Sequence, residues 1–123
     1  MALHSPELLD HFQNPRNVGH LPAPAVYVDV SNPACGDMLR LSARLERDTV
    51  AEVLYQVRGC TASIAAGSAL TEWMLGKTVT ELGALTPAVI EQALGGLQSA
   101  SKHVAILCVD GVRLLCAQVD CHG

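Results

Sequence analysis

The sequence lacks several features that mark well-known functional classes. Of its 123 residues only four are aromatic, so the core has to be built mainly from leucine, valine, isoleucine and alanine; the four are Phe12, Tyr27, Tyr55 and Trp73. Lysine and arginine total eight against twelve acidic residues, which gives a net charge of −4, and the basic residues form no cluster. Because phosphate binding requires concentrated positive charge, nucleic acid is not expected as a main partner.

Targeting signals, membrane spans and enzyme motifs are also missing. The first six residues have neither the positive region nor the apolar region of a secretory signal. The longest apolar stretch, residues 104–119, is interrupted by polar and charged side chains and is too short to span a membrane. The sequence contains no nucleotide-binding glycine motif, no serine-hydrolase or zinc-protease motif and no Cys-x-x-Cys. We therefore expect a cytoplasmic protein that is not an enzyme in the narrow sense and has no membrane partner.

Cysteine is present, and its number is odd. Five cysteines without a secretory signal argue against a disulfide framework. In a reducing cytoplasm, cysteines serve as metal ligands, as reactive thiols or as small core residues. Cys108 and Cys116 lie among isoleucine, leucine and valine and are expected in the core. Cys121 is one of the last three residues and is expected in a frayed tail.

The pattern of apolar residues predicts one domain over residues 1–123. Strands are expected at 25–30, 38–46 and 50–58, and helices at 6–14, 61–75, 87–94 and 102–119, with a further turn at 78–82. A turn is expected at 31–33, and Ser99 or Ser101 is expected to cap the last helix. Consecutive strands joined by short turns are antiparallel. The sequence therefore predicts an α+β two-layer domain, with a three-stranded antiparallel sheet packed against helices.

Three places in this outline carry residues suited to metal chemistry. Cys35 and Asp37 flank Gly36 on a turn that leads into a strand, so a thiol and a carboxylate could point at one ion. Cys60 lies where a strand gives way to a helix, and a helix N-terminus favours the thiolate that binds metal or attacks sulfur. His103 opens the last helix and could ligate through an unprotonated ring nitrogen, and the charge of Lys102 beside it would favour nearby thiolates.

Each place also has a plain structural reading. Cys35 could be an incidental residue of a turn, and Cys60 a small buried side chain, which is the common fate of a free cysteine. His103 could be an ordinary surface or capping residue. The residues taken singly leave these alternatives open.

Together, the motifs resemble the NifU N-terminal/IscU family of iron–sulfur cluster scaffolds. The resemblance covers nearly the whole chain and is weakest over residues 86–101. The matching stretches are residues 9–19 (LDHFQNPRNVG), 32–37 (NPACGD), 59–61 (GCT) and 71–77 (TEWMLGK). The resemblance implies that the chain accepts sulfur and iron, assembles a [2Fe–2S] cluster and passes it to apo-proteins. It implies a ligand site at Cys35, Asp37, Cys60 and His103, with Asp37 linked to cluster lability and Cys35 or Cys60 as sulfur acceptor.

The chain departs from the family at the third cluster-binding cysteine, where it has Val104. Valine cannot ligate a metal, so the implied set is two thiolates, a carboxylate and an imidazole. This set could hold a cluster or iron, and it is also a sound tetrahedral zinc set. Cys108 lies one helical turn after Val104, but about 6 Å further along the axis. It could substitute as a ligand only if the helix shifted or unwound.

The resemblance also implies partners and leaves three functions open. The expected partners are a cysteine desulfurase, an iron donor and apo-protein acceptors. The Leu-Pro-Pro-Val-Lys stretch that a dedicated Hsp70-type chaperone recognises in IscU proteins is replaced here by residues 97–101 (LQSAS), which argues against that chaperone. Besides the scaffold or carrier, the chain could be a zinc-binding sulfurtransferase, or a degenerate paralogue that keeps the fold and assembles nothing.

Overall fold

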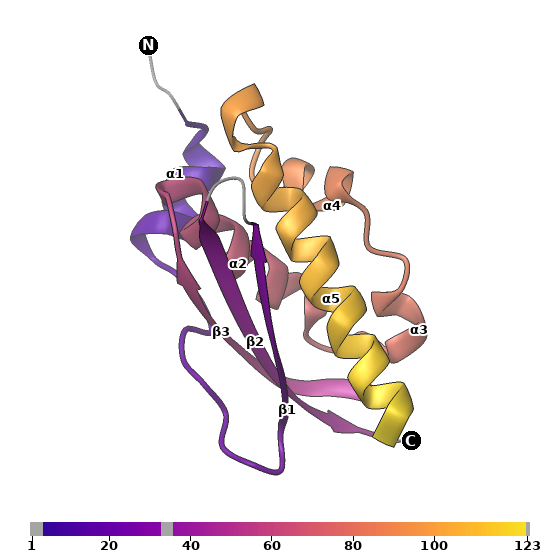
Figure 1. Ribbon diagram of the computed structural model, residues 1–123. Helices are drawn as coiled ribbons and strands as arrows, with labels where there is room; N and C mark the ends of the chain where they lie inside the picture. Colours follow the sequence, from indigo (N-terminus) through magenta and orange to yellow (C-terminus); the bar gives the residue numbers. More distant parts are fainter. Residues whose placement is uncertain (1–3, 33–35, 123) are drawn as a thin grey trace.

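In the computed structural model, which describes residues 4–32 and 36–122, the chain forms two layers (Figure 1). A three-stranded antiparallel sheet in the order β1-β2-β3 is covered on one face by helices. The elements are α1 (Pro6–Gln13), β1 (Val26–Asn32), β2 (Asp37–Glu46), β3 (Thr49–Arg58), α2 (Thr61–Met74), α3 (Val79–Leu82), α4 (Pro87–Ala93), the 3₁₀ helix η1 (Ser99–Ser101) and α5 (His103–His122). The predicted α+β architecture is confirmed.

Local sequence signals place most of the element ends. Ser5 caps α1, because its hydroxyl accepts a hydrogen bond from the Leu8 amide at 3.0 Å. Arg47 and Asp48 connect β2 to β3 with positive φ angles of 52° and 66°, the left-handed conformation that suits a two-residue hairpin turn. The strands and helices expected from the sequence all appear, within a few residues of the expected ends.

Two details of the prediction were wrong. The turn expected at 31–33 is not a turn at Ser31 and Asn32, because β1 continues there: Asn32 pairs with Asp37 and extends the antiparallel ladder. Residues 99–101 form a 3₁₀ turn of their own rather than a cap of the last helix, which begins at His103. In both cases pairing or packing with a neighbouring segment outweighed the local signal.

The core lies between the sheet and the helices. One row across the sheet consists of Val28, Leu41 and Tyr55, all buried on the face that α2 and α5 cover. The Tyr55 ring packs on Gly67 of α2, where an added Cβ would lie 2.3 Å from a ring carbon, and its hydroxyl donates to the Ile64 carbonyl at 2.8 Å. Otherwise the buried core is aliphatic, as expected.

The N-terminal motif at residues 9–19 ties α1 and the following loop to α2 and β3. The hydroxyl oxygen of Ser68 in α2 lies 2.7 Å from His11 Nδ1. The same oxygen accepts a hydrogen bond from the Arg16 amide at 3.0 Å. The Tyr55 amide donates to the Asn17 carbonyl at 2.8 Å, so the loop pairs with the outer edge of β3. This motif therefore has a structural role.

The long helix α5 connects the two ends of the sheet. It packs on β1 and β2, and in Figure 1 its first turn (orange) and its last turn (yellow) lie at opposite ends of the molecule. Within residues 4–32 and 36–122, no helix is long and apolar enough to cross a membrane. The first turn of α5 is the part that reaches the candidate site.

Candidate functional site

Three elements converge at one end of the sheet. Asp37 begins β2, Cys60 precedes α2, and His103 begins α5. Because β2 and β3 are antiparallel, with Met38 opposite Arg58, the start of β2 lies beside the end of β3. One ligand atom each from Asp37, Cys60 and His103 lies within 4.8 Å of the other two. These residues, far apart in the sequence, therefore form a group that could hold a metal ion.

The Asp37 carboxylate is the centre of a hydrogen-bonded network. Its side chain is only 7% exposed. Its Oδ2 lies 2.9 Å from His103 Nε2 and accepts from the Ser63 hydroxyl at 2.7 Å. The same hydroxyl lies 3.3 Å from Cys60 Sγ. Ser63 thus connects the carboxylate with the thiol, and within the described chain no buried side-chain polar atom lacks a partner.

Gly59 makes space for this network. A Cβ at Gly59 would lie 2.7 Å from Asp37 Oδ1 and 2.8 Å from Ser63 Oγ, closer than real Cβ contacts. The space next to this glycine is taken by the carboxylate and hydroxyl of the site itself.

The Cys60 thiol is open to solvent. Cys60 is the N-cap of α2, it is exposed, and its side chain does not bond the helix amides. The N-terminal end of a helix carries partial positive charge and favours anions. This placement excludes the plain reading of Cys60 as a buried core residue.

A cavity of about 400 Å³ opens over these groups. It is lined by His4, Asp37, Cys60, Thr61, Ala62, Ala100, Ser101 and His103. The three predicted ligands that the structure describes are therefore accessible from one open hollow. The fourth, Cys35, lies outside the described residues.

The remaining sequence candidates lie elsewhere. Val104 is buried at 1% exposure, and Cys108, one turn later, is buried at 2%. Burial raises the pKa of the Cys108 thiol to about 12, which disfavours the thiolate that a metal requires. Cys116 is half-buried against the core, as predicted. The Lys102 ammonium lies 3.4 Å from a carboxylate oxygen of Glu91, so its charge is paired there.

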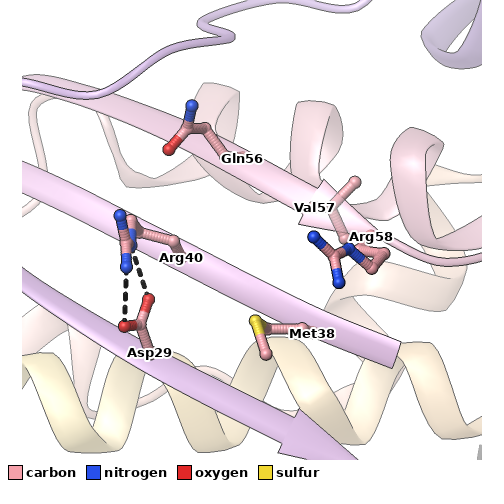
Figure 2. A pocket seen from close by; sticks show the side chains of 6 residues that line it. All are labelled: Asp29, Met38, Arg40, Gln56, Val57 and Arg58. Atoms are coloured by element: carbon pink, nitrogen blue, oxygen red, sulfur yellow. Dashed lines mark hydrogen bonds and ion pairs between the residues drawn. The ribbon is translucent and has the colours of Figure 1, made fainter. Parts of the chain in front are cut away.

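A second hollow, of about 290 Å³, lies on the uncovered face of the sheet (Figure 2). Arg40 crosses to Asp29 with hydrogen bonds of 2.6 Å and 3.0 Å, a bidentate pair on adjacent strands. The guanidinium holds the pKa of Asp29 below its usual range. Arg58 also lines this hollow, but the acidic side chain of the hollow, Asp29, is already paired with Arg40. The hollow over Asp37, where a carboxylate, a thiol and an imidazole meet, is the better candidate for chemistry.

Sequence reasoning missed two residues of the site, Ser63 and His4. Ser63 lies three residues after Cys60, a spacing that brings side chains together on one helical turn, so a signal for it existed. No sequence signal pointed to His4, because its place in the cavity wall depends on where α1 lies relative to α5.

A two-layer α+β domain with a thiol, a carboxylate and an imidazole around one cavity defines a candidate metal-handling domain. The family comparison agrees, since residues 3–118 match the sequence model of the NifU-like N terminal domain. The chain belongs to this family.

Relatives with assigned names are similar over most of the chain. A protein of Archaeoglobus fulgidus named iron-sulfur cluster assembly scaffold protein IscU is 36% identical over 90% of this chain and 72% of its own length. A protein of the same name from Haemophilus influenzae is 34% identical over 89% and 90%. One from Drosophila melanogaster, 33% identical over 92% and 75%, is named an assembly enzyme.

A solved structure supports the fold. The N-terminal NifU-like protein from Brucella abortus superposes with a TM-score of 0.77 over 94% of this chain and 93% of its own, at 18% identity. At that identity the likeness concerns the fold alone.

Proposed function

We propose that this chain is a scaffold on which iron and sulfide are assembled into a [2Fe–2S] cluster that is then passed to apo-proteins. The observation that carries the proposal is the group of Asp37, Cys60 and His103, with ligand atoms within 4.8 Å of one another in an open cavity. Membership in a family whose named relatives are cluster scaffolds supports it.

The donor set suits a cluster that is held and released. Cys60 supplies one thiolate, and Cys35, two residues before Asp37, is the proposed second. Iron–sulfur clusters also accept histidine in place of cysteine on one iron. His103 Nε2 and Asp37 Oδ2 now share a hydrogen bond of 2.9 Å. A metal on His103 Nε2 would replace this hydrogen bond, and binding of Cys60 as a thiolate should release the thiol proton to the solvent.

Sulfur would reach the site as a persulfide. The Cys60 thiolate attacks the outer sulfur of a persulfide on a cysteine desulfurase; a new S–S bond forms on Cys60, the old one breaks, and the desulfurase cysteine leaves as its thiolate. Two thiols of an external reductant would then become a disulfide as they release the outer sulfur of the Cys60 persulfide as sulfide. The exposure of Cys60 supports this role, because exchange requires an accessible thiol. Cys35 is the other acceptor candidate. Free thiols of this kind need a reducing compartment, which favours the cytoplasm.

A zinc-binding sulfurtransferase is the second candidate function. It is favoured by Val104, which puts a buried aliphatic side chain where a third thiolate would be required. One thiolate or two, a carboxylate and an imidazole form a tetrahedral set that zinc accepts. In this case one zinc ion would stay bound while a thiol carries sulfur.

Anaerobic reconstitution with ferrous iron and sulfide distinguishes the two functions. The scaffold predicts visible charge-transfer absorption and about two irons and two sulfides per chain. A colourless protein that retains one zinc and no iron would overturn the scaffold proposal. Cys60→Ala should abolish the absorption, whereas the buried Cys108→Ala, the matched control, should retain it.

A further inference from the structure

We infer that His4 is a further metal ligand of this cavity and supplies a donor that compensates for Val104. The inference rests on the proposed function, since it concerns the same site. Its starting point is the wall of the cavity, where His4 stands together with Asp37, Cys60 and His103. Residues 4 and 103 belong to the two ends of the chain, so tertiary packing alone brings them together.

The backbone next to His4 is held in place. Ser5 caps α1 through its hydroxyl, and that hydroxyl also hydrogen-bonds to the Leu94 carbonyl after α4. His4 is half-buried, and the contacts of Ser5 hold its backbone next to α1 and the end of α4. It also lines a neighbouring hollow formed with residues 95–98. Its side chain thus borders two open spaces and can turn toward the ligands.

The His4 side chain has to rotate to act as a ligand, because His4 does not belong to the close group of Asp37, Cys60 and His103. The atoms within 4.8 Å of one another come from Asp37, Cys60 and His103. Rotation about the two side-chain torsions of His4 moves its ring nitrogens across the shared cavity. On binding a metal, the imidazole closes the site from the side of the N-terminal segment.

His4 would add a donor to those already at the cavity. With it, the described residues offer two imidazoles, the thiol of Cys60 and the carboxylate of Asp37 around one cavity. Imidazole replaces thiolate on one iron of some [2Fe–2S] clusters, so a second imidazole can stand in for a missing thiolate. Asp37 can keep the hydrogen bond from the Ser63 hydroxyl, while His103 Nε2 exchanges its hydrogen bond with Asp37 for the metal.

Cobalt(II) titration of the purified chain, without air, tests this assignment. Thiolate-to-cobalt absorption in the near ultraviolet reports Cys60, and the visible d–d bands report coordination number. His4→Ala should weaken cobalt affinity at least about tenfold, the lower limit for loss of even an outer-sphere partner. It should also lower the d–d intensity and leave the thiolate band. His20→Ala is the control, because the His20 ring meets the Tyr27 ring edge to face and does not line the cavity.

The outcomes separate this inference from the proposed function. If His4→Ala and His20→Ala both keep the wild-type affinity and d–d spectrum while His103→Ala loses them, His4 is not a ligand and the site itself stands. If the wild type shows no thiolate band, or if Cys60→Ala leaves that band unchanged, the proposed site is wrong and the role of His4 is wrong with it. Circular dichroism of His4→Ala should match the wild type, and an additional His4→Gln variant should repeat its affinity loss.

Discussion

The space at Gly59 gives the sharpest prediction about the site. Its backbone conformation is open to alanine, but the added Cβ would lie 2.7 Å from Asp37 Oδ1 and 2.8 Å from Ser63 Oγ. The carboxylate has to move, and its move strains or breaks the 2.7 Å bond from Ser63. A hydrogen bond to a charged group contributes about 1.5–3 kcal/mol. Since both side chains can partly adjust, Gly59→Ala should cost about 1–2 kcal/mol.

Thermal unfolding of the metal-free protein and cobalt titration measure the effect. For a domain of this size the expected loss corresponds to a fall in Tm of roughly 4–8 °C. Displacement of the carboxylate should also weaken cobalt binding. Gly83→Ala is the matched control, because its Cβ would meet the carbonyl oxygens of Thr80 and Val79 at ordinary contact distances of 3.4 Å and 3.9 Å.

A double-mutant cycle tests the cause. Ser63→Ala removes one of the two atoms that the new Cβ would meet, so Gly59→Ala should cost less in that background than in the wild type. If Gly59→Ala matches Gly83→Ala in both Tm and cobalt affinity, the packing described around Asp37 is wrong.

Three further predictions concern the third cysteine position, the core and pH. Val104→Cys should raise the cluster retained after reconstitution, and unchanged absorbance would count against a site built around the start of α5. Gly67→Ala should destabilise the fold by about 1–2 kcal/mol in urea, since overpacking against the buried Tyr55 ring costs more than the gain in helix propensity; a Tyr55→Leu background should remove that cost. Burial, and next the charge of Arg16, lower the pKa of His11 from its ordinary value of 6.5. The neutral His11 imidazole therefore stabilises the fold above pH 6.5, and this contribution is lost as the pH falls through the lowered pKa. The free energy of unfolding should therefore fall less steeply below pH 6.5 in His11→Asn than in the wild type, and equal slopes would refute this.

Most of the fold could be predicted because its signals are local. The alternation of Leu39, Leu41 and Ala43 identified the buried face of a strand, and those side chains are buried. Pro6 after Ser5 placed a helix start. Such patterns reflect the periods of helix and strand, which the neighbouring residues decide among themselves. The end of β1 was missed because it depends on pairing with Asp37, on another strand.

The candidate site was only partly predictable for the same reason. Residue types pointed to Asp37, Cys60 and His103 one at a time, and only the resemblance to the scaffold family implied that they form one site. That their ligand atoms come within 4.8 Å follows from antiparallel pairing and from the docking of α5. The link that Ser63 makes between the thiol and the carboxylate depends on the tertiary packing that brings α2 next to the start of β2.

By itself, the sequence determined the kinds of element, the aliphatic character of the core and the inventory of donor groups, including the valine where a third thiol would be. Only the tertiary structure decided how close the donor atoms lie, that Cys60 faces solvent, and that His4 stands at the cavity wall. The physical reason is distance along the chain: contacts between residues as far apart as 37 and 103 are decided by how whole elements pack.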